Sequence, residues 1–549
     1  MTNREIGGKF RELADLMELL GDNPFKIRSY RSAYQKLRSY DHDLENLSLN
    51  ELESIPGVGK AISAKIIELG ETGEISALEK VKNKVPGQVA ELLKIKGLGP
   101  GKVRKLWKGL EILSPGELLY ACEENRLISL KGFGEKSQED IRNKVKYYLS
   151  QRGYFFFHQL DDAAKRLIES IKEHFPNNKT EVSGDLRRLE NTASEILLLT
   201  TVSADELKSS RINDFILTKI EGDSIEGMME EKWPVRIHTV AESDFGLKQL
   251  QLTGPENFVN SLLGEEKNKT IKVSDEEGVF DSFEKAYLQP EFRNWADTEK
   301  AFQIQDKKRI SEDDIKGVIH SHSTWSDGAH SLEKMALAAR DKGYEYLAIT
   351  DHSAYASYAG GLKEKDVLAQ WEEIDQLNQQ LAPFRIIKGI EADILPDGSM
   401  DYTSDLLGNF ELVIASVHSV LNMDIEKATK RLISAVENPH VHMLGHPTGR
   451  LLLSRPGYPL DKEKLLDACA ANGVIIELNA NPYRLDLDWS WILPAMERGI
   501  KFSINPDAHS IEGIDDIRHG VRAARKGGML MEDCINCLSE KDFLGIMKG

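Results

Sequence analysis

The stretch VIHSHSTWSDG, Val318 to Gly328, decides the fold of the rear part of this 549-residue chain. Its apolar run ends in two histidines, His320 and His322, and a Ser-Asp-Gly turn places Asp327 close behind them. Further β-branched runs follow it, YLAITDH, IIKGIEADI, LVIASVH, VHMLGH, VIIELNA and FSINPDAH, with helical segments such as Leu332 to Arg340 between them. Short apolar strands that alternate with helices are typical of βαβ units. We therefore expect parallel strands that close into a barrel through right-handed crossovers.

Polar side chains end most of these runs, and the carboxyl ends of barrel strands meet at one rim. His320 and His322, two residues apart, are expected to point to the same side of a strand, as are Asp507 and His509. Buried polar groups are costly unless they bind a partner, so a cluster of this composition predicts a metal site. The predicted ligands are His320, His322, Asp327, His352, Glu391, His418, His446, Asp507 and His509.

The front of the chain repeats one pattern, an apolar residue, a Gly-x-Gly and then a helix with Lys or Arg. The copies are IPGVGKAISAKI (Ile55 to Ile66), IKGLGPGKVRKL (Ile95 to Leu106) and LKGFGEKSQEDI (Leu130 to Ile141). The glycines allow a tight turn, and the free N–H groups of the next helix can hold a phosphate oxygen. The pattern resembles helix-hairpin-helix DNA-binding motifs, which contact the backbone and not the bases. The predicted DNA-binding residues are Gly57, Gly59, Lys60, Gly97, Gly99, Lys102, Arg104, Gly132, Gly134 and Lys136.

The charge of the chain is unevenly distributed. The net charge is −18, of which residues 1–150 carry +3 and the remainder −21 by direct count. DNA is therefore expected to bind at the front. Four cysteines in so long a chain argue against a disulfide framework. No apolar run approaches the roughly 20 residues of a membrane span, and the first residues lack the apolar core of a signal peptide. We expect a cytoplasmic monomer that does not bind membranes.

The first hairpin and the preceding segment NPFKIRSYRSAYQKLRSY, Asn23 to Tyr40, together resemble the N-terminal domain of family X DNA polymerases. In that family a lysine in the second helix of the hairpin can form a Schiff base with an abasic sugar. The resemblance places Lys65 at this position. A desolvated lysine is a competent nucleophile, but a lysine on an amphipathic helix is also explained by simple exposure to solvent.

The segment VSGDLRRLENTASEILLLTT, Val182 to Thr201, resembles the palm signature of the same polymerases, in which acidic residues hold two divalent ions. Here Glu195 and Leu197 stand where the family has Asp-x-Asp, and Arg236 stands where a third aspartate is expected. Asp185 also replaces the serine expected near the triphosphate. Leucine and arginine do not coordinate metal ions, so we expect that polymerase activity has been lost.

The rear motifs HSHSTWSDG, AITDHS, GIEADIL, ASVHS, GHPTGRLLLSRPGY, ELNANPYRLDLDW and NPDAHS are similar to PHP (polymerase and histidinol phosphatase) domains, specifically those fused to bacterial family X polymerases, PolX. The resemblance implies up to three divalent ions, Mn²⁺ or Zn²⁺ or also Fe²⁺, which suit imidazole and carboxylate ligands. It implies that His320, His322, Glu391 and Asp507 hold one ion, that Glu391 bridges to a second held by His418 and His446, and that Asp327, His352 and His509 hold a third. The expected catalytic residues are Glu391, Asp507, His418, Arg450 and Arg484, the two arginines as holders of substrate phosphate.

The predicted fold is a multidomain α/β chain. It comprises a helical N-terminal domain with the first helix-hairpin-helix (residues 1–80), a fingers-like hairpin region (81–150), a degenerate nucleotidyltransferase-like α+β palm and thumb (151–300) and a distorted (β/α)7 PHP barrel (312–549). We expect a DNA-binding, metal-dependent phosphodiesterase, a 3′–5′ exonuclease or a processor of 3′ ends or abasic sites in repair. The alternatives are an active PolX polymerase with exonuclease activity, a non-catalytic DNA-binding scaffold and a small-molecule phosphatase.

Overall fold

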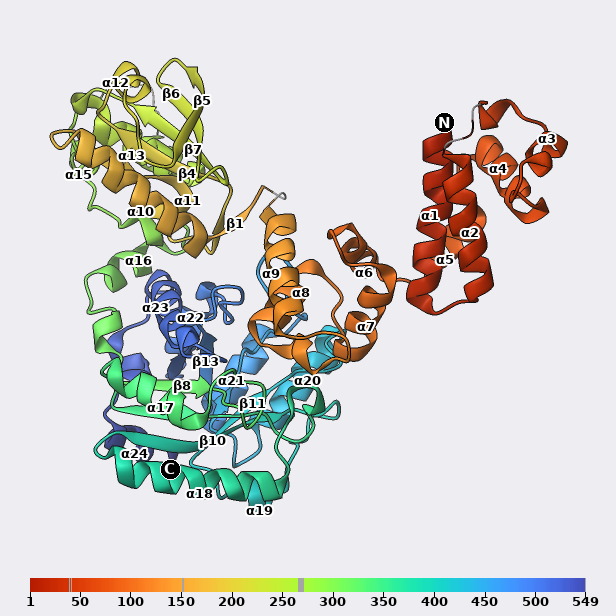
Figure 1. The fold of residues 1–549 in the computed structure, drawn as a ribbon. Coiled ribbons are helices and arrows are strands. Elements are labelled where there is room, and N and C mark those ends of the chain that lie inside the picture. Colours follow the sequence, from red (N-terminus) through yellow and green to blue (C-terminus); the bar gives the residue numbers. More distant parts are fainter. Residues whose placement is uncertain (39, 41, 151–152, 265–270, 549) are drawn as a thin grey trace. The chain divides into compact units, whose positions relative to one another are not determined.

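The computed structural model describes residues 1–549 except residues 39, 41, 151–152, 265–270 and 549. The chain forms two compact units, Met1–Leu149 and Ser150–Gly549 (Figure 1). The finer domain boundaries expected from the sequence stay predictions.

The first unit is helical. Helix α1 begins with a capping box between Thr2 and Glu5, ends at Gly21 in the left-handed conformation and buries Phe10 and Leu13. Such caps satisfy the free N–H and C=O groups at the helix ends. The helices are α1 (Asn3–Leu20), α2 (Pro24–Leu37), α3 (Leu49–Ser54), α4 (Lys60–Thr72), α5 (Ser76–Lys82), α6 (Gly87–Glu91), α7 (Pro100–Leu110), α8 (Pro115–Glu123) and α9 (Glu135–Ser150).

The second unit begins with the palm-like part, a sheet of strand order β2-β4-β7-β6-β5 in which only β4 and β7 are parallel neighbours. Its strands are β2 (Thr180–Val182), β4 (Ile196–Thr200), β5 (Phe215–Glu221), β6 (Ser224–Met229) and β7 (Trp233–Thr239), and the short β1 (Phe155–Phe156) pairs with β3 (Thr192–Ala193). The helices of this part are α10 (Phe157–His174), α11 (Gly184–Arg187), α12 (Ala204–Ser209), α13 (Phe245–Thr253), α14 (Glu256–Leu263), α15 (Glu277–Ser282) and α16 (Thr298–Gln305).

A seven-stranded parallel sheet of order β14-β13-β12-β11-β10-β9-β8 makes up the core of the rear part. Its edges meet where Ser321 bridges to Ala508 and the N–H of His322 donates to the carbonyl of Ala508 at 2.9 Å, so the sheet is a nearly closed barrel. The predicted barrel is thus confirmed. Its strands are β8 (Gly317–Ser321), β9 (Tyr346–Ile349), β10 (Arg385–Asp393), β11 (Leu412–Ser416), β12 (Met443–Leu444), β13 (Ile475–Asn479) and β14 (Phe502–Asn505).

The barrel strands are apolar on both faces, as parallel strands covered by helices usually are. Val318, Leu347, Ile386 and Val413 belong to one core cluster, whereas the following residue of each strand belongs to a second cluster that also contains Phe543 of α24 (Glu540–Met547). The outer helices are α17 (Leu332–Asp341), α18 (Glu364–Leu381), α19 (Ser404–Leu407), α20 (Ile425–Val436), α21 (Lys462–Asn472), α22 (Ile492–Met496) and α23 (Ile517–Lys526). Apolar side chains therefore fill most of the barrel, and polar ones gather in and just past the carboxyl-terminal parts of the strands.

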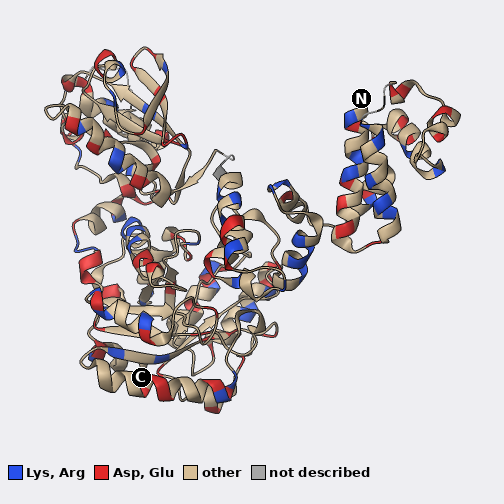
Figure 2. Cartoon of the chain, in the orientation of Figure 1, with Lys and Arg blue, Asp and Glu red and all other residues tan. Residues whose placement is uncertain are grey.

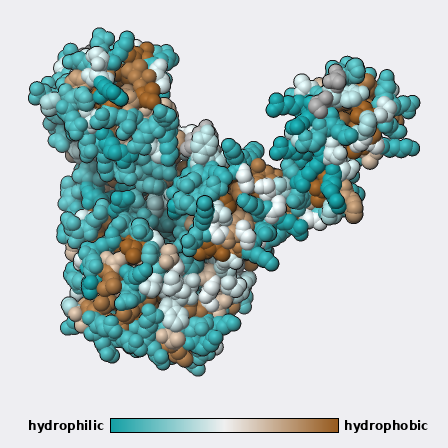
Figure 3. All heavy atoms as spheres, in the orientation of Figure 1, coloured by the Kyte–Doolittle hydropathy of each residue, from teal (hydrophilic) through white to brown (hydrophobic). Residues whose placement is uncertain are grey.

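The face drawn in Figure 3 is mostly hydrophilic. No helix within the described ranges has both the length and the apolar character needed to pass through a bilayer. Cys122, Cys469, Cys534 and Cys537 are buried free thiols.

Candidate functional site

Glu391, inside β10, lies at the centre of a buried cluster at the carboxyl ends of the barrel strands. Its Oε1 is 3.3 Å from Nε2 of His320, 3.2 Å from Nε2 of His418 and 3.0 Å from Nε2 of His446. Its Oε2 is 2.9 Å from Nδ1 of His352. One carboxylate therefore faces imidazoles from the ends of four different strands.

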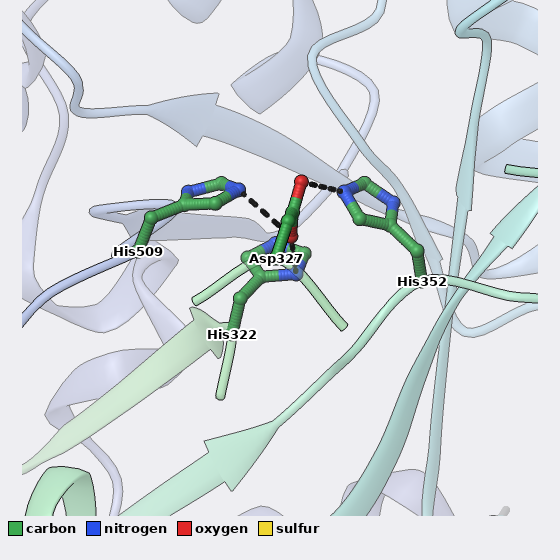
Figure 4. Close-up of side chains that lie close together, drawn as sticks. All are labelled: His322, Asp327, His352 and His509. Atoms are coloured by element: carbon green, nitrogen blue, oxygen red, sulfur yellow. Dashed lines mark ion pairs between the residues drawn. The ribbon is translucent and has the colours of Figure 1, made fainter. Parts of the chain in front are cut away.

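Asp327, in the loop after β8, organises the neighbouring side of the cluster (Figure 4). The carboxylate lies between His509 and His352, with Oδ1 3.4 Å from Nε2 of His509 and Oδ2 3.6 Å from Nε2 of His352. Nδ1 of His322 is 3.9 Å from the same Oδ1. Four side chains thus converge on a space of the size that one cation needs.

Asp507, which follows the last strand β14, joins the two sides of the cluster. Its Oδ1 is 3.1 Å from Nε2 of His322 and 3.4 Å from Nε2 of His320. The structure therefore brings together all nine side chains that the sequence analysis selected, from segments nearly 190 residues apart.

The donor set fits divalent transition metals. Three groups of side chains each offer ligand atoms within 4.8 Å of one another: His322, Asp327, His352 and His509; His320, His322 and Glu391; and His352, Glu391 and His418. His418, the most exposed of the nine, has only 12% of its side chain exposed. Within the described part of the chain, Nε2 of His320 and Nδ1 of His446 are buried without a hydrogen-bond partner. Imidazole and carboxylate ligands in this proportion suit Mn²⁺, Zn²⁺ or Fe²⁺.

The imidazoles and carboxylates of the cluster shift the pKa values of one another. Burial by itself lowers the pKa of His418, but the carboxylates of Glu391 and Asp393 outweigh it and raise the pKa to about 9. Burial raises the pKa of Asp327, yet the imidazoles of His352 and His509 hold it well below its ordinary value. The carboxylates are therefore ionised, and a metal ion can take the place of the protons that the imidazoles would otherwise carry.

The local backbone corrects one expectation from the sequence. The regular two-residue spacing on a strand does not place His320 and His322, because the register of β8 against β9 shifts between Val318 and Ser321 and His320 has a φ of +63°. His446 and Asp507 also have positive φ angles, 24° and 53°. Asp507 and His509 lie beyond β14, which ends at Asn505. Such conformations cost free energy and are found mainly where the surrounding structure imposes them, as at functional sites.

A buried carboxylate that the sequence analysis missed holds the loop carrying Asp327. Asp351 accepts hydrogen bonds from the backbone N–H of Ser323 at 2.8 Å and its hydroxyl at 2.7 Å, from Nε2 of Gln370 at 2.7 Å, and from the hydroxyl of Ser326. Its position beside His352 in the motif TDHS was the available signal. Asp393, Glu477 and Asn479 also contact the ligand side chains from behind and were likewise missed.

The two predicted phosphate-holding arginines occupy different surroundings. Arg450 donates to the carbonyls of Arg484 and Leu485 and forms an ion pair with Asp488. Its guanidinium therefore braces the loop that carries Arg484. Arg484 is buried. Burial of His446 and, second, the positive charge of Arg484 lower the pKa of His446 to about 3. This places Arg484 next to the cluster.

The three hairpins of the first unit share one backbone geometry. Gly57, Gly97 and Gly132 have φ angles of 90°, 90° and 99°, which favour glycine. Gly59 and Gly99 adopt an extended conformation at the N-caps of α4 and α7. Figure 2 shows basic residues on these helices, with acidic residues among them. Lys60, Lys102, Arg104 and Lys136 are all exposed, and the guanidinium of Arg104 lies near Gly21 at the end of α1.

Lys65, the predicted lyase residue, lies on α4. Its Nζ donates to the carbonyl of Ala61 at 3.2 Å and lies 5.9 Å from the ring centre of Tyr30. The lyase role of Lys65 stays a prediction.

In the palm-like sheet, the positions that resemble a polymerase metal site are filled by other interactions. Leu197 on β4 pairs in register with Arg236 on β7. Nε of Arg236 lies 3.2 Å from the carboxylate of Glu195, and its Nη1 lies 3.6 Å from Glu226. Arg236 therefore occupies the position at which the resemblance to family X polymerases predicts a metal-binding aspartate.

Comparisons with known proteins identify the family. Residues 1–75 match a helix-hairpin-helix domain, residues 89–146 a SAM-like helix-hairpin-helix tandem and residues 319–481 the PHP domain. The DNA polymerase/3′-5′ exonuclease PolX of Bacillus subtilis is 34% identical, with 100% of both chains covered. This chain belongs to the PolX family. Proteins named probable phosphatase match the rear part, one from Thermoanaerobacter sp. at 29% identity over 40% of this chain and 88% of its own, and one from Acetivibrio thermocellus at 32% over 30% and 65%.

Membership of the PolX family confirms the resemblance stated from the sequence. The helix-hairpin-helix matches imply DNA binding, and the PHP match and the relatives support a hydrolase.

Proposed function

We propose that this PolX-family protein is a metal-dependent phosphodiesterase that acts on DNA, as a 3′–5′ exonuclease or as a processor of 3′ ends or abasic sites in repair. The observation that carries the proposal is the convergence of six imidazoles and two further carboxylates around Glu391 at the barrel rim. The chain would act in the cytoplasm as a monomer, and residues 1–150 would hold the DNA backbone.

The residues of the cluster would have different roles in the reaction. Glu391 faces imidazoles on both sides and would hold two neighbouring ions at a fixed separation. When bound, divalent ions supply Lewis acidity and activate water for attack on phosphorus near neutral pH. Asp507 and His418 would hold the reacting centre, and Arg484 would orient the phosphate next to it. The buried walls around these side chains keep other water away.

Loss of polymerase activity is part of the proposal and rests on the palm-like sheet. Arg236 and Leu197 leave two metal-ligand positions without a carboxylate. Arg187 and Arg188, which would attract a triphosphate, instead pair with Glu276 and Asp185. A nucleotide would have to break these pairs before it could bind.

Primer extension tests this part of the proposal against an active PolX polymerase. With Mn²⁺ and dNTPs, the purified protein should leave a primer unextended while it shortens the labelled strand. The B. subtilis relative serves as the comparison protein. Extension products from this chain would contradict the loss of synthesis.

His418→Ala tests the hydrolase site. We expect this variant to cleave end-labelled single-stranded, gapped and abasic DNA more than about 100-fold more slowly. The site then lacks one of the imidazoles that face Glu391 and would hold a metal ion. DNA binding should be unchanged, since the hairpins are untouched. His440→Ala is the matched control, because this histidine of the same barrel contacts Ser404 outside the cluster and should retain activity.

The outcomes of this experiment separate the alternatives. A wild-type protein that binds DNA and never cleaves a phosphoester would be a scaffold and would refute the proposal. The relatives named probable phosphatase favour a small-molecule phosphatase as the second candidate. Faster hydrolysis of small phosphomonoesters than of DNA would select that function.

A further inference from the structure

Strand β13 provides none of the nine predicted ligands, although it ends at the same rim as its neighbours. It does provide Glu477 and Asn479, two residues apart and both completely buried. Side chains two apart on a strand point to the same face. Each of them contacts a different predicted ligand, His320 or Asp507.

Glu477 fixes the ring of His320. Its Oε2 lies 2.8 Å from Nδ1 of His320 and 3.3 Å from Nδ2 of Asn505, which donates to it. A histidine that binds a metal through one ring nitrogen usually donates a hydrogen bond from the other to a carboxylate or carbonyl. Here Glu477 engages Nδ1, and Nε2 is the ring nitrogen that faces the cluster, 3.3 Å from Glu391 and 3.4 Å from Asp507. Glu477 thus turns the metal-binding nitrogen of His320 toward the cluster.

Asn479 fixes the carboxylate of Asp507. Its Nδ2 donates to Oδ2 of Asp507 at 2.9 Å, while the other oxygen of Asp507 faces His322 at 3.1 Å. The amide of Asn479 is itself held, because its Oδ1 accepts from the N–H of Asn481 at 3.1 Å. Asn479 therefore leaves Oδ1 of Asp507 for the cluster.

We propose that Glu477 and Asn479 are positioning residues that set the metal affinity of the site through His320 and Asp507. The inference rests on the metal-dependent site of the proposed function and assigns β13 the task of orienting ligands from both the first and the last barrel strands. Residues that orient metal ligands from behind are worth about 10- to 100-fold in metal affinity.

The test is a Mn²⁺ titration of the metal-free full chain, followed by electron paramagnetic resonance of the free ion and by calorimetry. Glu477→Ala and Asn479→Ala should each lower the affinity of the tightest ion by about 10- to 100-fold. Glu477→Gln should lose less, because it keeps an acceptor oxygen for Nδ1. Thr429→Ala is the matched control, since this buried hydroxyl on α20 accepts from the N–H of Asp461 and should leave Mn²⁺ affinity unchanged.

Thermal unfolding of each metal-free variant checks that it folds. If Glu477→Ala does not fold, the Mn²⁺ affinity of Glu477→Gln is used in its place. Wild-type affinity and stoichiometry in folded Glu477 and Asn479 variants would overturn the inference, as would an equal loss in Thr429→Ala. Mn²⁺ affinity is measured without DNA. If the variants bind Mn²⁺ more weakly but the wild type cleaves no phosphoester, only the proposed function is refuted. If the wild type is an active nuclease but the variants bind Mn²⁺ normally, only the inference about Glu477 and Asn479 is refuted.

Discussion

Glu276 lies between two arginine side chains and is almost completely buried. Its Oε2 is 2.7 Å from Nη1 of Arg187, and its Oε1 is 2.6 Å from Nη1 of Arg293. Burial by itself raises the pKa of Glu276, but Arg293 and then Arg187 outweigh it and hold the pKa below its ordinary value. A carboxylate with a lowered pKa adds stability above its unfolded pKa, and this stability is lost as the pH falls through the folded pKa.

Glu276→Gln should therefore cost about 3–5 kcal/mol at pH 7, because it leaves two buried guanidinium groups without their counter-charge. The difference from the wild type should stay constant above the ordinary glutamate pKa of about 4.3 and shrink at lower pH. Urea unfolding at several pH values measures it. A difference that is small at pH 7, or that grows toward acid pH, would contradict the role given to Glu276.

Arg450 and Arg484 offer a matched comparison, since Lys keeps the charge of both but loses the planar fork. Arg450→Lys should lower the stability by about 2 kcal/mol, because one ammonium cannot hold two carbonyls and Asp488 at once. Arg484→Lys should raise KM for DNA about tenfold, because a bidentate hold on phosphate is lost. Unfolding curves and steady-state kinetics measure the two effects. Equal effects of both variants on KM would remove the distinction.

Among single residues, the nine candidate ligands could be selected from the sequence because they lie within, at the end of or shortly after apolar runs, which is a local pattern. The residues behind the ligands were not predictable in this way. Glu477 is 157 positions from His320, and only closure of the barrel brings them together. Polar residues within a strand pattern carry no sign of such a partner.

At the element scale, the two glycines of each hairpin have different tasks. Gly57 requires a positive φ, so a side chain there strains the backbone. Gly59 has a φ of −91°, and a Cβ at this position would meet nothing within 4 Å. The open space at Gly59 is where a phosphate can approach the first N–H groups of α4.

Gly59→Ala should therefore leave the stability nearly unchanged and weaken DNA binding several-fold, because its methyl group occupies the path of the phosphate. Gly70→Ala is the control on the same helix, since its Cβ also meets nothing within 4 Å. It should keep DNA binding and gain up to about 1 kcal/mol of stability. Fluorescence anisotropy with a labelled duplex measures the affinities. Normal binding by Gly59→Ala would exclude this first hairpin from the DNA contact.

The elements also show what the sequence predicts well and what it does not. The barrel strands and the repeated hairpins were predictable because their periods are short. The irregular end of β8 was not, because it lies where Ser321 bridges to Ala508, beyond β14, and where His320 contacts Glu477, and both partners are far away in the sequence. In the palm-like sheet, Arg236 was the basis for predicting that the polymerase metal site is lost, but its pairing with Leu197 and Glu195 depends on the parallel register of β4 and β7.

At the scale of the whole second unit, helix α23 connects the barrel to the palm-like part. Lys526 is completely buried, and its Nζ donates to the carbonyl of Arg188 at 2.6 Å and to Glu190 at 3.1 Å. Arg522 donates to the carbonyl of Glu190 at 3.2 Å. The segment that resembles the palm signature of polymerases therefore contacts helix α23 of the barrel part.

Lys526→Ala should lower the stability of the full chain by about 1.5–3 kcal/mol, the usual worth of hydrogen bonds to a charged group. Lys430→Ala, at an exposed position on α20, should change it by no more than about 0.5 kcal/mol. Thermal and urea unfolding compare the two variants. An unchanged midpoint for Lys526→Ala would show that the two parts are stable without this connection.

The order of the barrel strands has a consequence during protein synthesis. His320 belongs to the first strand, Asp507 and His509 follow the last, and the bridge from Ser321 to Ala508 joins them. Domains near the amino end can fold while the ribosome is still adding residues. In a nascent chain the hairpins can therefore fold and bind nucleic acid well before the ribosome adds the last predicted metal ligands, Asp507 and His509. In the proposed function, a prematurely terminated product would hold a strand without cutting it.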